Sequence, residues 1–187
     1  MFDHTRRFCI SLVSAVLLAT GAAAAELEKP AGPALVTITG KITQANQDEF
    51  EAFRDKLFEV HDLRYDRAAA FDLAMLEELG MEEVSLQYRD WDARHTFEGP
   101  LLRDVLAAAG ASGDIVLPMA LDGYAAEIPM SDLQKWPVIL ALKMDGEYMA
   151  VGGAGPTFVI YPMNDYPELA GEDDAKLVWG VFHIAVE

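Results

Sequence analysis

A tryptophan within a run of charged residues is the first candidate for binding chemistry. Trp91 stands in Arg89-Asp-Trp-Asp-Ala-Arg-His95, a composition that is typical of a loop. Core positions rarely have so many charged neighbours, so the pattern indicates an indole face on which a flat ligand can stack. The alternative is a tryptophan that folds over the edge of the core. His95, in the same run, could donate a hydrogen bond to a ligand carbonyl.

Two glycine-containing turns further along the chain could also approach a ligand. Asp122-Gly-Tyr124 is typical of a tight turn between two strands, although the Asp122 carboxylate could instead pair with adjacent N–H groups of a ligand. Gly152-Gly-Ala-Gly155-Pro is a flexible turn whose backbone N–H groups could come close to a ligand. This turn lacks the lysine and the hydroxyl residue of a phosphate-binding loop.

Metal and nucleophile chemistry have no support in the sequence. Neither His95 nor His183 has a second histidine or a carboxylate at a recognisable metal-ligand spacing, and His183 is typical of a strand histidine. No Gly-x-Ser-x-Gly motif is present. The remaining tryptophans, Trp136 and Trp179, are predicted to be structural, with Trp179 buried in an apolar strand. These patterns leave no catalytic residue to name.

Many short strands and few helices are expected to position these residues. Apolar and β-branched runs predict strands, and apolar residues at helical spacing predict helices. The strands are expected at residues 34–42, 83–88, 115–121, 125–128, 138–144, 158–161 and 177–186, and the helices at 48–60, 71–79 and 101–109. Asp145-Gly146 predicts a hairpin turn. The whole pattern is that of one mixed α+β domain over residues 26–187.

The first 25 residues predict a signal peptide for export. Arg6 and Arg7 precede an apolar stretch, residues 8–25, which ends in small residues before Glu26. We expect Sec-type export, cleavage near Ala25 and a periplasmic mature protein. A transmembrane anchor is the competing interpretation, but the apolar stretch is barely long enough and contains polar residues. No membrane insertion is expected after cleavage.

The chain is strongly acidic and has a single cysteine. It contains 31 Asp and Glu residues against 14 Lys and Arg, a net charge of −17, which repels nucleic acid and anionic lipid. Cleavage near Ala25 would remove Cys9, the only cysteine. The mature protein is therefore expected to have no disulfide and no thiolate for a metal.

Four segments carry, in a fixed order, a family resemblance. They are Phe97-Glu-Gly-Pro-Leu-Leu-Arg-Asp-Val-Leu106, Asp122-Gly-Tyr-x-x-Glu-Ile-Pro-Met-Ser-Asp-Leu133, Gly155-Pro-x-x-Val-Ile-Tyr-Pro162 and Leu177-Val-Trp-Gly-Val-Phe-His-Ile184. In order and spacing they resemble the molybdopterin-binding domain of sulfite-oxidase-type oxidoreductases. Together with residues 34–42 and 71–76, the resemblance covers most of residues 34–186. It implies the sulfite-oxidase-like molybdopterin-binding fold.

Within that family the chain is most similar to small exported members made of this domain alone, such as periplasmic pterin-binding regulators of the PruR type. The likeness runs through Trp91-x-x-x-His-Thr-Phe-Glu-Gly-Pro100 and Ile160-Tyr-Pro-Met-x-x-x-Pro-Glu-Leu169. Those regulators pass a pterin signal to a transmembrane enzyme of cyclic-di-GMP metabolism. The resemblance implies one ligand-binding pocket, with Trp91 as the stacking residue and with His95, Asp122, Tyr124, Gly155, Tyr161 and Asn164 around it.

Two departures from the family pattern bear on the cofactor. The family's enzymes hold molybdenum through a cysteine that follows the strand expected at 83–88, where this chain has Ser85-Leu-Gln-Tyr-Arg-Asp-Trp91. The small members usually carry basic residues before the Gly-Pro turn and a tryptophan at the position of Phe158, and this chain has neither. Because a phosphate-bearing pyranopterin needs cations there, an unphosphorylated pterin or a different ligand is favoured, and molybdenum is not expected.

The sequence therefore predicts a non-catalytic periplasmic protein that binds a pterin-like molecule and reports to a transmembrane signalling protein. Two alternatives stay open. One is a molybdopterin-dependent oxidoreductase with an atypical metal ligand, and the other is a ligand-free structural partner. Residues 44–68 form a longer segment than is usual in the small members, and this segment could cover the pocket or form a partner surface.

Overall fold

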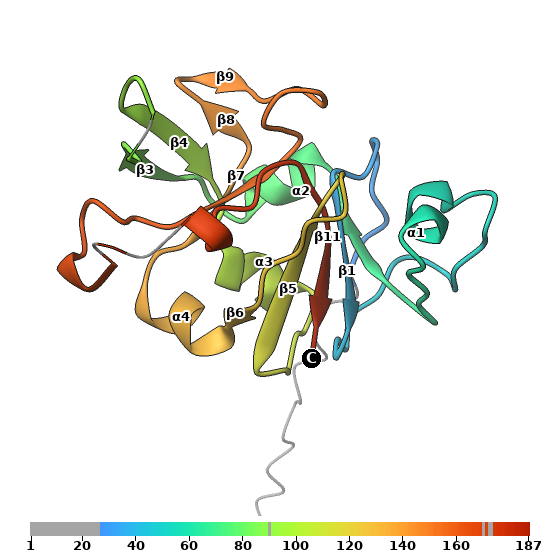
Figure 1. The fold of residues 1–187 in the computed structure, drawn as a ribbon. Helices are drawn as coiled ribbons and strands as arrows, with labels where there is room; N and C mark the ends of the chain where they lie inside the picture. The colour runs from blue at the N-terminus through green and yellow to red at the C-terminus, as the bar shows by residue number, and fades with distance from the viewer. Residues whose placement is uncertain (1–26, 90, 170, 172–173) are drawn as a thin grey trace, which may run out of the picture.

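A five-stranded sheet forms one side of the protein (Figure 1). The computed structural model describes residues 27–89, 91–169, 171 and 174–187, so the predicted signal peptide lies outside the described residues. In the strand order β2-β1-β11-β5-β6, β1 and β11 are parallel, and all other neighbouring strands are antiparallel. The strands are β1 (Val36–Gly40), β2 (Ala69–Phe71), β5 (Ile115–Ala120), β6 (Ile128–Pro129) and β11 (Val181–Val186).

A four-stranded antiparallel sheet carries the loops around Trp91. Its order is β3-β4-β8-β9, formed by β3 (Glu82–Leu86), β4 (His95–Gly99), β8 (Lys143–Met144) and β9 (Glu147–Tyr148). Asp145 and Gly146 join β8 to β9 with φ angles of 53° and 82°, as in a type I′ turn, so the predicted hairpin is confirmed. The pair β7 (Ile139–Ala141) and β10 (Phe158–Ile160) continues from β4, because the Leu140 N–H donates to the Pro100 carbonyl.

The helices are short and have clear boundaries. The carboxylate of Asp72 begins α2 (Leu73–Glu78) by accepting from the Met75 N–H at 3.0 Å, and it also accepts from the Gly32 N–H at 2.7 Å. These two backbone hydrogen bonds lower the pKa of Asp72. Gly110, with a φ of 64°, follows α3 (Leu102–Ala108), and α4 (Met130–Lys135) packs beside α3.

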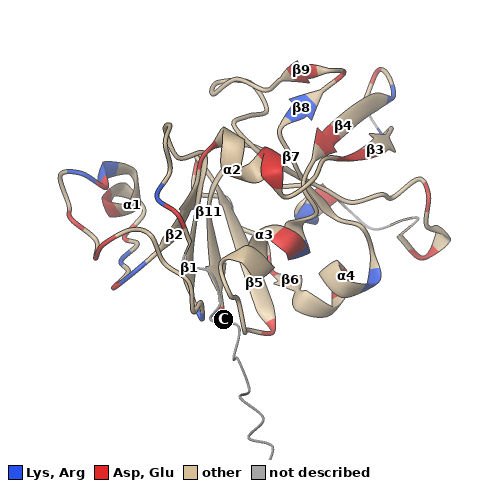
Figure 2. Ribbon diagram, turned by 180° about the vertical axis from the view of Figure 1, so that it is seen from behind, with Lys and Arg blue, Asp and Glu red and all other residues tan. Residues whose placement is uncertain are grey.

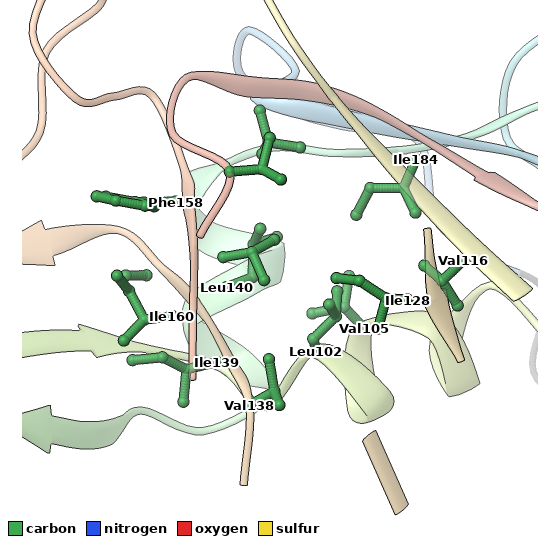
Figure 3. Close-up of a cluster of buried hydrophobic side chains, with 14 of the residues drawn as sticks. Leu102, Val105, Val116, Ile128, Val138, Ile139, Leu140, Phe158, Ile160 and Ile184 are labelled. Atoms are coloured by element: carbon green, nitrogen blue, oxygen red, sulfur yellow. The ribbon is translucent and has the colours of Figure 1, made fainter. Parts of the chain in front are cut away.

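The hydrophobic core lies between α3 and the sheets (Figure 3). Val105 of α3 faces Val116 and Ile128 of the five-stranded sheet, and all three are fully buried. The same cluster continues to β7 and β10 through Leu140 and Phe158. Burial of each such side chain stabilises the fold by roughly 1.5–3 kcal/mol. Since the chain has a single cysteine, no disulfide within the chain adds to this stability.

Acidic residues lie in α2 and in β3 (Figure 2). Glu82 and Glu83 of β3 are exposed, and β3 is an edge strand of its sheet. Charges on an edge strand oppose pairing with a second chain. Glu82 and Glu83 therefore protect this edge of the sheet from pairing with another strand.

Residues 44–68 form a lobe outside β1, with α1 (Lys56–Val60) at its outer edge (Figure 1). The ring of Phe58 makes edge contacts with Phe182 and His183 of β11, at centroid distances of 5.4 Å and 5.2 Å. The lobe therefore packs on β11.

The predicted α+β class is confirmed, whereas the helix expected over residues 48–60 is reduced to α1. The Glu51 carboxylate accepts from the N–H groups of Phe53 and Arg54, which holds this stretch in turns before the helix begins. Phe53 is 90% exposed, so this stretch does not form the buried apolar stripe that a helix over residues 48–60 would have. In the described part of the chain, no helix is long and apolar enough to cross a membrane.

Candidate functional site

A depression walled by aromatic rings lies between the β3–β4 connection and the turn before β10. We call it the Trp91 depression. Its volume is about 380 Å³, and its lining residues are Trp91, Asp92, His95, Phe97, Met144, Ala154 and Phe158. The indole of Trp91 lies 5.9 Å from the His95 ring and 5.8 Å from the Phe97 ring, and Phe97 lies 5.6 Å from Phe158. Such a chain of rings offers faces and edges to a flat ligand.

Trp91 is half-buried, with one side packed on the core. A turn places it there, because the Trp91 N–H donates to the Tyr88 carbonyl at 2.9 Å. Its indole therefore has both of the properties that the sequence left as alternatives. It covers the edge of the core, and it lines a depression that is open to solvent.

His95 is held by Asp145 across the sheet. One Asp145 oxygen lies 2.7 Å from Nδ1 of His95, and the other accepts the Thr96 N–H at 2.9 Å. The Thr96 N–H, and then His95, lower the pKa of Asp145, which keeps this carboxylate ionised at neutral pH. An ionised carboxylate requires Nδ1 to carry the proton, so Nε2 of a neutral His95 accepts hydrogen bonds. With Nδ1 bonded to Asp145, a neutral His95 accepts from a ligand through Nε2, and a doubly protonated His95 donates to a ligand carbonyl, as expected from the sequence.

Asn164 fastens the segment that carries Trp91. Its side-chain oxygen accepts from the Gln87 N–H at 2.8 Å and from the Arg94 guanidinium at 3.1 Å. These two donors lie on either side of Trp91 in the sequence. Asn164 is thus a positioning residue, and it does not line the Trp91 depression.

Gly155 and Tyr161 are both buried. A Cβ on Gly155 would lie 2.4 Å from the Met149 carbonyl oxygen, so close packing of backbone requires glycine here. Tyr161 is 1% exposed, and its hydroxyl donates to Asp132 at 3.2 Å. The expectation that Tyr161 lines a pocket rim is therefore wrong. Neighbouring Ala154, and not Gly155, reaches the Trp91 depression.

Asp122 and Tyr124 line a second depression, which we call the Trp179 depression. Its volume is about 370 Å³, and its lining residues are Ala120, Asp122, Tyr124, Asp174, Ala175, Leu177 and Trp179. Trp179 is 48% exposed, so the prediction that it is buried is wrong. The two depressions adjoin, because Trp179 pairs with Phe158 in an antiparallel bridge and the Gly180 N–H donates to the Ala154 carbonyl at 2.8 Å. The predicted site residues thus divide between two neighbouring depressions, two buried positions and the exposed positioning residue Asn164.

The Trp91 depression does not fit a molybdenum cofactor. Gln87 follows β3 where the family's cysteine is expected, and its backbone N–H is bonded to Asn164. The described residues contain no cysteine and no cluster of three His, Cys, Asp or Glu side chains that could hold a metal ion. Among the described residues, no Lys or Arg lines either depression, so they offer a cofactor phosphate no cationic partner there.

Comparison with known proteins agrees with this architecture. The family described as the oxidoreductase molybdopterin binding domain matches residues 36–164. No curated protein matches the sequence. Among solved structures, the crystal structure of the sulfane dehydrogenase SoxCD from Paracoccus pantotrophus matches with a TM-score of 0.54 and 13% identity, over 82% of this chain and 38% of that chain. At this identity the likeness concerns the fold, and this chain spans less than half of that protein.

Proposed function

Because the chain belongs to the oxidoreductase molybdopterin-binding domain family, we propose that it is a non-catalytic binding protein that holds a flat pterin-like heterocycle in the Trp91 depression. One observation carries the proposal. An aromatic wall and a histidine oriented by Asp145 line the same depression, and none of its lining residues is a cysteine.

The wall suits a flat heteroaromatic ring. Trp91 offers an indole face, and Phe97 and Phe158 close the inner side of the depression. Stacking of a heterocyclic base on an aromatic side chain contributes about 1–3 kcal/mol in nucleic-acid complexes, and a pterin presents the same kind of π-face. Met144 adds a polarizable contact on the same wall.

The polar groups suit the N–H edge of a pterin. His95 and Asp92 both line the depression, and each carries a hydrogen-bond acceptor, Nε2 of a neutral imidazole and a carboxylate. A pterin carries an amino group and ring N–H donors, which such acceptors recognise. Because the described residues that line the depression include no Lys or Arg, the ligand we propose carries no phosphate.

Export and signalling complete the proposal. The predicted signal peptide supports a periplasmic location, and the resemblance to small exported pterin-binding regulators supports a transmembrane signalling protein as the partner. The 44–68 lobe does not line the Trp91 depression. It leaves Phe53 and Val60 exposed, which suits a partner surface better than a pocket cover.

Analysis of the protein purified from its native host tests this function. The protein is denatured, the released small molecules are identified by mass spectrometry, and metals are measured on the same sample. We expect a pterin without phosphate and no stoichiometric molybdenum. Stoichiometric molybdenum would instead support an oxidoreductase with an atypical metal ligand. A protein that releases no small molecule would support a structural partner.

A further inference from the structure

The Trp179 depression combines aromatic rings with negative charge. Trp179 and Tyr124 are 48% and 47% exposed, although large aromatic side chains are on average mostly buried in folded proteins. Two acidic residues, Asp122 and Asp174, are part of the same lining. The other lining residues are small or aliphatic, and none is basic.

Backbone contacts fix the parts of this depression. The Tyr124 hydroxyl donates to the Ala175 carbonyl at 2.8 Å, and the Asp122 carboxylate accepts the Tyr124 N–H at 2.9 Å. The bond from Tyr124 to Ala175 ties the β5–β6 turn to the segment before β11, and the bond from Tyr124 to Asp122 holds the turn itself. Trp179 is held by its bridge to Phe158. Both ring-bearing residues are therefore positioned by contacts with neighbouring segments.

The nearest cation in the sequence, Lys176, is engaged elsewhere. Its ammonium lies 2.8 Å from the Asp132 carboxylate and 5.7 Å from the centre of the Tyr161 ring. It does not line the Trp179 depression. The two acidic residues of the lining are thus accompanied by no Lys or Arg among the described residues that line the depression.

From this arrangement we propose that the Trp179 depression binds a small organic cation, through an alkylammonium or guanidinium group. The faces of Trp and Tyr rings attract such cations, and a nearby carboxylate adds Coulomb attraction. A phosphate or carboxylate ligand would instead be repelled by Asp122 and Asp174. The site is separate from the Trp91 depression, and the proposal does not rest on pterin binding.

Calorimetric titration of the mature protein tests the site with defined probes. Choline represents an alkylammonium, agmatine represents a guanidinium, and 3,3-dimethylbutan-1-ol is the neutral isostere of choline. We expect at least one of the two cations to bind and the neutral alcohol not to bind. Trp179→Leu should weaken cation binding about three- to fivefold, as expected for loss of one exposed cation–π contact.

Two further variants separate binding from folding. Asp122→Asn keeps the oxygen that accepts the Tyr124 N–H but removes the charge, so it should weaken cation binding without unfolding the turn. Glu82→Gln removes an exposed charge on β3 and should leave binding unchanged. Equal binding of choline and its neutral isostere would overturn the proposal. So would the absence of binding by both cations, including the case in which only a basic peptide binds.

Discussion

The Asp145 carboxylate, which lies 2.7 Å from Nδ1 of His95, sets the hydrogen-bonding character of the Trp91 depression. Asp145 belongs to the hairpin turn between β8 and β9, and His95 is the first residue of β4. The turn has a positive φ at Asp145, a conformation that Asp and Asn adopt more readily than other side chains. One residue therefore closes the hairpin and orients the histidine.

Asp145→Asn should reverse the tautomer of His95. Asn fits the same turn and can still accept the Thr96 N–H, but its amide nitrogen would then face Nδ1. Nδ1 would become an acceptor and Nε2 a donor. Nitrogen NMR of the histidine ring should show this change, with little change in thermal stability. An unaltered Nδ1–H tautomer in the variant would contradict the assigned role of Asp145.

Asn164→Ala should loosen the segment that carries Trp91. The variant leaves the Gln87 N–H and the Arg94 guanidinium without their shared acceptor, which should cost about 1 kcal/mol of unfolding free energy. Hydrogen exchange should become faster at the Gln87 amide. Asn164→Asp is the matched control, since it keeps an acceptor for both donors. Equal exchange rates in the two variants would show that Asn164 does not hold this segment.

Gly155→Ala should destabilise the fold, whereas Gly153→Ala should not. A Cβ at residue 155 would lie 2.4 Å from the Met149 carbonyl oxygen, while the nearest atom to a Cβ at residue 153 is 3.5 Å away. Forced overpacking typically costs about 1–3 kcal/mol. Chemical denaturation of both variants measures the difference. Comparable stability of the two would mean that the turn rearranges freely.

His183 should make the protein less stable as the pH falls from about 6.5 toward 4. Burial lowers the pKa of His183 to about 4, because the ring is 2% exposed and Nδ1 has no hydrogen-bond partner among the described residues. The unfolded chain therefore binds a proton in this range before the folded protein does, and stability is lost. The loss from this residue should approach about 3 kcal/mol.

Denaturation curves measured across this pH range check the role of His183, with His183→Leu as the comparison. Thr39 contacts Nε2 at 2.8 Å, and Phe58 and Phe182 pack on the ring, so these neighbours offer no carboxylate to stabilise a protonated ring. Acidic residues elsewhere also lose charge as the pH falls, and the comparison removes their common contribution. Equal pH dependence in the wild type and the variant would disprove this role.

Local patterns were sufficient to predict much of the fold. The β-branched run of β1, the Asp145-Gly146 turn and the glycine after α3 each carry a local conformational preference, and all three are confirmed. Strand β4 was not predicted, because His95 and Thr96 lie in a charged stretch that is not typical of a strand. Pairing with β3 and β8 overrides that composition.

The arrangement of the site depended on contacts that local sequence does not encode. Trp179 lies in an apolar stretch, yet its bridge to Phe158 leaves the indole at the surface. Tyr161 follows the glycine turn, yet its hydroxyl is drawn inward to Asp132. Asp145 was recognised only as a turn residue, and its contact with His95 joins residues 50 positions apart. A contact between residues so far apart in the sequence can be identified only when the pairing of the strands is known.

The measurement that tests the central claim most directly is a pterin titration of Trp91→Ala alongside its thermal unfolding. With biopterin as the probe, the account predicts a ten- to hundredfold loss of affinity, which corresponds to about 1–3 kcal/mol of stacking, and a smaller loss of stability. Trp136→Phe, at a tryptophan outside the depression, should leave the affinity unchanged. A fall in stability of about 3–5 kcal/mol, as expected for a buried tryptophan, together with unchanged biopterin affinity would contradict the account.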